Sequence, residues 1–279
     1  MLINNRVILK KAAVFTDVSG ILCDPYEGLQ ALVAVPADDA LYIGSDLPFN
    51  NRFFLLGKKN TIAGTVSVAF WDGSAFTAAV DVQDLTSVGG VPFARNGLIR
   101  FDLPKNKSWG KVYDSTDIAE LAGVTARANF WAKLTFSAAF DFEMKYVGFS
   151  FAKDSDLNTY YKQLLQETTM RAFNGGTPMA NWDAVHVVAA EEVIRELKKD
   201  QIIISGNQLL DTELFKDAQC HKLAEMAYSG GGLRNTEVME QAQLRFKQAM
   251  AKRVFNVDEN RNGRLDTVEK TEPCLLRRI

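Results

Sequence analysis

The spacing of apolar residues changes near residue 151, and this change constrains the fold more than any single motif does. Before it, short runs alternate apolar and polar residues and are separated by glycine or proline, as β-strands are. After it, apolar residues recur every three or four positions, which is the spacing of one face of an α-helix. The chain is therefore predicted to be an α+β protein with strands first and helices second.

The first part has the pattern of an antiparallel β-sandwich. In residues 130–140, apolar residues at the even positions are predicted to face a core, and Trp131 is predicted on the opposite face. Asp72-Gly73-Ser74 separates two apolar runs, 64–71 and 75–82, and this arrangement predicts a hairpin. At least seven such runs predict a jelly-roll-like sandwich over residues 1–153.

The second part has the pattern of a helical bundle over residues 154–257. Helices are predicted at 157–173, 182–199, 217–228 and 235–255, and glycine-rich segments separate them. Residues 258–279 are predicted to form a separate loop and an extended C-terminal tail.

Residues 258–269 match the twelve-position calcium loop of an EF-hand. Ca²⁺ prefers several oxygen ligands, and a glycine at the sixth position, here Gly263, allows the loop to turn sharply. The predicted ligands, with the backbone carbonyl serving at Arg264, are Asp258, Asn260, Asn262, Arg264, Asp266 and Glu269. Ca²⁺ is the one cofactor that the sequence suggests.

The surroundings of this motif leave a second interpretation open. Pro273 shortens the helix that should follow the loop, no second loop pairs with it, and Arg261 lowers its negative charge. The alternative is a turn in which Asp and Asn side chains accept hydrogen bonds from backbone amides without any metal.

Composition and residue placement argue against several functional classes. A net charge of -2 is unlike that of a dedicated nucleic-acid-binding protein. The N-terminus lacks a signal-peptide pattern and no apolar run is long enough to span a membrane, so a soluble protein made in the cytoplasm is expected. His186 and His221 both fall within predicted helices, and Cys220 cannot pair with the adjacent His221 on a helix. We expect structural histidines and a protein that is not an enzyme.

Aromatic residues in the first part suggest an alternative function. A β-sandwich with exposed rings such as Trp71 and Trp109 could stack against sugars, as in a carbohydrate-binding module of a tail or surface protein. Core packing explains most of these rings equally well, and a sugar-binding module would not need more than a hundred helical residues.

The order of several short segments resembles the head-to-tail adaptor (connector) proteins of the neck of tailed bacteriophages, and contractile-tailed phages in particular. The segments that carry the resemblance are 41–50, 68–73, 80–86, 97–109, 130–134, 149–157, 182–197 and 207–211. The resemblance implies a structural virion protein at the head-tail interface, assembled in the host cytoplasm.

The resemblance also implies partners. Such proteins form a homo-oligomeric ring, of about twelve copies, that docks beneath the portal protein and contacts tail-proximal neck proteins. DNA passes through the lumen without sequence-specific binding, and no membrane is involved. The C-terminal tail is implied to engage the portal, through the residues Pro273, Leu275, Leu276, Arg277, Arg278 and Ile279. Its apolar residues follow a proline and are too few to build a core, which is typical of a docking segment.

Overall fold

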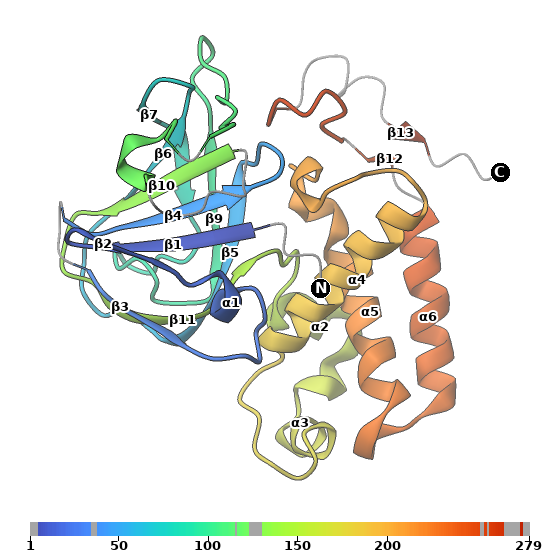
Figure 1. Ribbon diagram of the computed structural model, residues 1–279. Helices are drawn as coiled ribbons and strands as arrows, with labels where there is room; N and C mark the ends of the chain where they lie inside the picture. Colours follow the sequence, from blue (N-terminus) through green and yellow to red (C-terminus); the bar gives the residue numbers. More distant parts are fainter. Residues whose placement is uncertain are drawn as a thin grey trace. The chain divides into compact units, whose positions relative to one another are not determined.

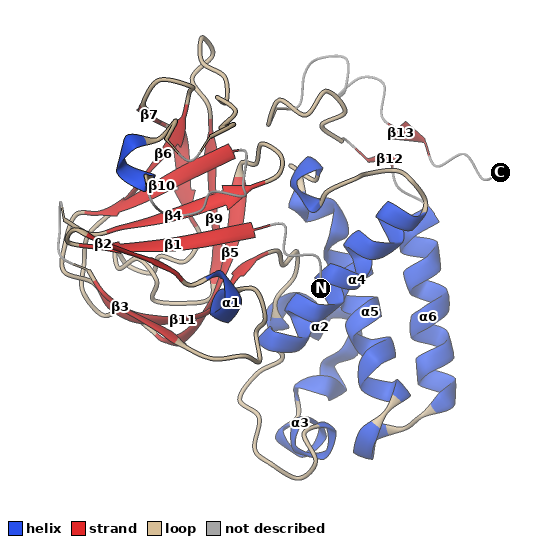
Figure 2. Cartoon of the chain, in the orientation of Figure 1, coloured by secondary structure: helices blue, strands red, loops and turns tan. Residues whose placement is uncertain are grey.

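The computed structural model describes residues 5–34, 38–114, 116–122, 130–251, 254–255, 257–264 and 274–275. It confirms an α+β protein with two antiparallel sheets followed by helices (Figure 2). The chain forms two compact units. Unit 1 contains the described residues up to Gly148 together with Asp258–Arg264, and unit 2 begins at Phe149 and contains the helices of the second part (Figure 1). The expected boundaries were after residues 153 and 257; the 258–264 loop packs with unit 1.

Unit 1 consists of two antiparallel sheets. The six-stranded sheet has the order β2-β1-β4-β10-β6-β7, and the five-stranded sheet has the order β3-β11-β5-β9-β8. The strands of the first sheet are β1 (Asn5–Lys11), β2 (Val14–Asp17), β4 (Ala40–Ser45), β6 (Val66–Trp71), β7 (Phe76–Ala78) and β10 (Phe130–Phe136). Those of the second are β3 (Gln30–Val33), β5 (Asn51–Lys58), β8 (Val80–Asp84), β9 (Gly97–Asp102) and β11 (Asp141–Gly148). Two short helices, α1 (Ser19–Leu22) and η1 (Ala119–Leu121), lie between strands.

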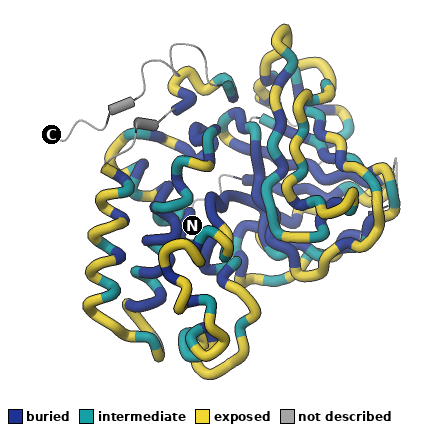
Figure 3. Tube along the Cα trace, turned by 180° about the vertical axis from the view of Figure 1, so that it is seen from behind, coloured by how far each residue is buried: buried dark blue, intermediate teal, exposed yellow. Residues whose placement is uncertain are grey.

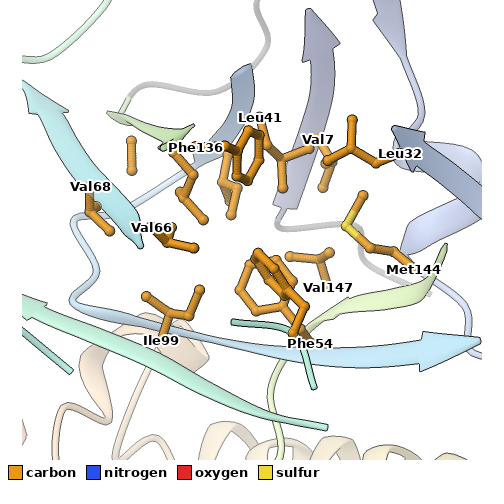
Figure 4. Packing of buried hydrophobic residues seen from close by; sticks show 14 of the residues in the cluster. Val7, Leu32, Leu41, Phe54, Val66, Val68, Ile99, Phe136, Met144 and Val147 are labelled. Carbon is orange, nitrogen blue, oxygen red and sulfur yellow. The ribbon is translucent and has the colours of Figure 1, made fainter. Parts of the chain in front are cut away.

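The main core lies between the two sheets (Figure 4). Leu134 of β10 lies opposite Leu41 of β4 and Val68 of β6 in the antiparallel register. The other sheet contributes side chains such as Phe54 and Met144. Because alternate residues of each strand point to the same face, the period-two pattern of the sequence produces this apolar layer directly.

Trp131 corrects the prediction for the other face of the first sheet. The strand was expected to be half-buried, with Trp131 on the face away from the core, but this side chain is fully buried. A second apolar cluster covers this face, in which Val112, Ile118 and Leu121 pack with residues of the sheet that include Tyr42 and Trp131. A segment distant in sequence therefore covers a face that local alternation marks as polar.

The predicted hairpin at Asp72-Gly73-Ser74 is confirmed, because β6 and β7 pair in antiparallel register around it. The strand expected at 75–82 is, however, two strands in different sheets. β7 ends at Ala78, the backbone N–H of Ala79 donates to the carbonyl of Val68, and β8 continues in the other sheet. Val80 already pairs with Asp102 of β9, and the bulge that follows it contains Asp81, which has a φ of 49°.

Unit 2 is built from helices. They are α2 (Asp154–Tyr161), η2 (Lys162–Leu165), α3 (Glu167–Phe173), α4 (Asp183–Lys199), η3 (Gly206–Gln208), η4 (Thr212–Phe215), α5 (Lys216–Ser229), η5 (Gly231–Leu233) and α6 (Thr236–Ala251). The single helix expected at 157–173 is interrupted at Gln166, which has extended backbone angles. The helix expected to end at Phe255 ends at Ala251, and Val254–Phe255 (β12) pairs with Cys274–Leu275 (β13).

The helices of unit 2 differ in how much of their surface is buried (Figure 3). Eight residues of α4 are buried, among them Val193 and Leu197, whereas α6 buries only Ala242, Phe246 and Met250. α4 is therefore a central element of the core, and α6 packs at its border, mainly against α5. Among the described residues, no helix is long and apolar enough to cross a membrane.

Candidate functional site

The 258–264 loop is organised by its own polar side chains. Asp258 is only 1% exposed, and its carboxylate accepts hydrogen bonds from the backbone N–H groups of Asn262 (3.0 Å) and Gly263 (2.7 Å). Asn260 Oδ1 also accepts from the Asn262 N–H (3.1 Å), and Asn262 Oδ1 accepts from the Arg264 N–H (2.8 Å). These bonds close a compact turn without any metal.

The turn requires left-handed backbone at two positions. Arg261 has a φ of 59° and Gly263 has a φ of 81°. Gly263 has a second constraint, because an added Cβ would lie 2.7 Å from Trp109 Nε1 and 3.0 Å from Pro48 Cβ. Glycine is therefore needed both for the backbone angle and for close approach to unit 1.

Arg264 fixes the same loop to unit 1. Its guanidinium donates hydrogen bonds to the backbone carbonyls of Pro104, Lys105 and Lys107, at 2.6 Å for Lys107 and 3.4 Å for Lys105. Beneath the loop, Trp109 packs against Phe49 and Phe70 with ring centroids 5.1 and 5.5 Å away. The loop therefore covers the part of the aromatic core that surrounds Trp109.

The predicted calcium ligands are only partly described. Asp258, Asn260, Asn262 and Arg264 lie together in the loop, whereas Asp266 and Glu269 lie outside the described residues. The described part of the chain contains no group of three His, Cys, Asp or Glu side chains placed to hold a metal ion. The oxygens of Asp258, Asn260 and Asn262 accept backbone hydrogen bonds, which is what the metal-free turn predicts. The first half of a calcium loop uses the same three residues, so this observation fits both interpretations. The calcium assignment stays a prediction.

The predicted partner-binding tail is also largely outside the described residues. Pro273, Leu276, Arg277, Arg278 and Ile279 are not described. Leu275 is described as part of β13, where its backbone lies opposite Val254 of β12. Its role in binding a partner stays a prediction.

Both histidines are buried in unit 2 and hydrogen-bonded, as expected for structural residues. Gln219 Oε1 accepts from the backbone N–H groups of Phe151 (2.6 Å) and Ala152 (3.1 Å), so its amide NH₂ faces His186 Nδ1 at 3.0 Å. His186 Nδ1 is thus the acceptor, and Nε2–H donates to Asp154 Oδ1 at 3.2 Å. This network fixes the segment at which the chain enters unit 2.

A similar contact holds His221. Its Nδ1 lies 3.0 Å from the hydroxyl of Tyr161. The neighbouring Cys220 is fully buried, and burial raises the pKa of its thiol to about 12. Such a thiol is almost entirely protonated at neutral pH, which makes it a poor nucleophile.

The aromatic rings proposed for sugar stacking are not at the surface. Trp71 and Trp109 are each 8% exposed. Trp71 packs on Phe76 with ring centroids 5.5 Å apart, and Trp109 lies in the aromatic core described above. The residues that suggested a carbohydrate site are therefore part of the packing of unit 1.

Sequence reasoning missed the docking of the loop onto unit 1. Arg264 and Lys107 are separated by 157 positions, and no local pattern joins them. The glycine at 263 was a signal for the turn but not for the surface that the turn contacts. No protein-family model and no curated protein matches this chain.

Proposed function

We propose that this protein is a non-enzymatic structural component of a tailed-phage virion, which forms a ring in the neck and joins the portal to the tail. The proposal starts from the segments that resemble head-to-tail adaptors. The observation that carries it is the placement of the helical unit. The resemblance implies helices from about 157 to 255, and the described helices of unit 2 extend from Asp154 to Ala251. We also propose that the two antiparallel sheets of unit 1 form a jelly-roll-like sandwich.

The mechanism would be mechanical. Each copy contributes one contact to the portal and one to the tail-proximal neck proteins, while DNA passes through the lumen without sequence-specific contacts. Repetition around a ring of about twelve copies makes weak single contacts effectively permanent, because partial dissociation leaves the other contacts in place. The C-terminal tail, with Leu275, Leu276 and Ile279, would supply the portal contact.

Native mass spectrometry with portal rings from the same genome tests this function. A discrete complex with one copy of this protein per portal subunit is expected. A variant that lacks residues 271–279 should remain folded and lose the complex. Free monomer beside bare portal rings would refute the adaptor role, and full binding by the truncated variant would refute the role of the tail.

We further propose that the EF-hand-like segment 258–269 binds Ca²⁺ and that the ion stabilises the fold. The described half of the segment presents oxygens of Asp258, Asn260 and Asn262 in one turn. Added Ca²⁺ should raise the melting temperature of the wild type, because an ion that binds only the folded state stabilises it. Glu269→Gln, which removes the expected bidentate carboxylate, should abolish this rise. An equal rise in the variant would contradict the assignment.

A further inference from the structure

Exposed large apolar side chains gather in two groups on unit 1. The first group, called patch A, contains Ile21, Tyr26 and Leu29, which are 36%, 67% and 49% exposed. Ile21 belongs to α1, and Tyr26 and Leu29 belong to the segment between α1 and the edge strand β3. The Leu29 side chain lies against Gly57, where an added Cβ would come within 2.3 Å of its Cδ2. Patch A is therefore supported by the sheet beneath it.

The second group, called patch B, contains Ile62, Leu85 and Val88, which are 39%, 38% and 51% exposed. They belong to two loops, residues 60–65 and 85–94, that contain no charged residue. Twelve of these sixteen positions are at least partly exposed, and in a chain with 24% charged residues so many exposed positions without a charge are unusual. Burial in an interface explains this composition, because charged residues are depleted at the centres of interfaces.

Patch B is held in one conformation by hydrogen bonds. Val88 and Val91 each donate a backbone N–H to the other's carbonyl, at 3.1 and 3.0 Å, around Gly89 and Gly90. The Gly64 N–H donates to the carbonyl of Gly90 at 3.1 Å and thereby joins the two loops. A fixed apolar projection loses little conformational entropy when it binds.

The net charges beside the two patches are opposite in sign. Asp24 and Glu27 flank patch A, whereas Lys59 and Arg95 flank patch B together with one acidic residue, Asp84, which precedes Leu85. Arg95 is adjacent to patch B in space as well, because its Nε donates to the carbonyl of Leu85 at 3.0 Å. The two surfaces are thus complementary in charge as well as both apolar.

The two patches are attached to different strands of the same sheet. Patch A precedes the edge strand β3 and lies against Gly57 of the central strand β5. In patch B, Leu85 and Val88 follow the opposite edge strand β8, and Ile62 follows β5. Contact between patch A of one copy and patch B of another leaves one patch of each kind open on the pair. Such a head-to-tail contact adds further copies, and it closes into a ring if the rotation between copies allows it.

We propose that patch B of one copy docks on patch A of the next copy and that this contact joins the subunits of the assembly. The proposal rests on the proposed ring, and it names the surfaces that would form the ring.

Cysteine cross-linking tests this contact directly. The test uses Tyr26→Cys and Val88→Cys in a Cys274→Ser background, in which the remaining native residues Cys23 and Cys220 are buried. The two variants are oxidised separately and as a mixture, both free at high concentration and on portal rings. Only the mixture should give a disulfide-linked dimer, and the double variant should give a ladder of multimers. Val14→Cys replaces Tyr26→Cys in the control mixture, because Val14 is 64% exposed but belongs to neither patch.

Charge reversal provides a second test. Glu27→Lys alone and Lys59→Glu alone should each weaken self-association at least several-fold, and the two changes together in one chain should restore it. Two results would overturn the proposed contact. One is that the mixture of Tyr26→Cys and Val88→Cys forms no more dimer than the Val14→Cys control, both free and on portal rings. The other is that the double charge reversal does not restore self-association. Portal binding is measured separately. If the variants bind portal rings but the Tyr26–Val88 cross-link does not form there, the proposed interface is refuted and the adaptor role is not.

Discussion

Replacement of Gly263 by alanine should detach the 258–264 loop from unit 1. The residue has a φ of 81°, and the added Cβ would lie 2.7 Å from Trp109 Nε1. Trp109 is 8% exposed and packed among aromatic rings, so it cannot move aside easily. The loop should therefore move instead.

The expected cost has two parts. Left-handed backbone costs a non-glycine residue about 1–2 kcal/mol. Forcing a methyl group into a closely packed site costs about 1–3 kcal/mol in addition. Together they predict a loss of about 2–5 kcal/mol for the docked state of the loop.

Hydrogen exchange and urea unfolding measure this loss. The backbone amides of Asn262 and Arg264 are bonded to side chains of the loop, so their exchange reports its opening. A loss of about 2 kcal/mol corresponds to exchange about thirty-fold faster at these amides. Gly89→Ala is the matched control, because Gly89 has a φ of 58° but no atom within 4 Å of an added Cβ. It should cost only the backbone part, about 1–2 kcal/mol, and leave exchange at Asn262 and Arg264 unchanged.

Two results would refute this reasoning. One is wild-type exchange at Asn262 and Arg264 in Gly263→Ala. The other is a loss in Gly263→Ala no larger than that in Gly89→Ala, because the contact with Trp109 would then contribute nothing.

Three further predictions concern buried polar groups. The Asp72 carboxylate accepts hydrogen bonds from Ser74, Ala75 and Thr77. Lys107 Nζ also donates to Asp72 Oδ2 at 2.6 Å, and this bond is the main reason that the pKa of the Asp72 carboxyl lies well below its usual range. Because the folded-state pKa is lowered, its contribution is complete above the unfolded pKa of about 4 and is lost as pH falls. Asp72→Asn should cost about 1–3 kcal/mol in urea unfolding at pH 7 and about 1 kcal/mol less at pH 3, and equal costs at both pH values would contradict this. Gln219→Leu leaves two buried N–H groups, of Phe151 and Ala152, without their acceptor, and should destabilise unit 2 by about 2–4 kcal/mol in urea unfolding. A loss below about 1 kcal/mol would contradict this role of the Gln219 amide. The Cys220 thiol should react with a thiol reagent only at the rate of unfolding, and fast labelling in the native state, absent in Cys220→Ser, would show that the thiol is accessible.

Local sequence signals predicted much of the fold because the structures that they specify are local. The hairpin around Asp72-Gly73-Ser74 depends on turn residues adjacent in sequence, and α4 depends on apolar residues three and four positions apart. The same holds for the turn at 258–264, in which the hydrogen bonds from Asp258, Asn260 and Asn262 to backbone amides of the loop join residues at most five positions apart.

Only the tertiary structure decided what covers these elements. Trp131 is buried because Val112, Ile118 and Leu121 cover its side of the sheet, and the run 75–82 divides because its two halves pair with different neighbours. Arg264 binds carbonyl groups of residues more than 150 positions earlier. The sequence by itself determined the order of strands and helices and the turns between them, since these depend on backbone preferences and the period of apolar residues. Which faces and loops meet depends on contacts between distant residues, and such contacts leave no periodic signal in the chain.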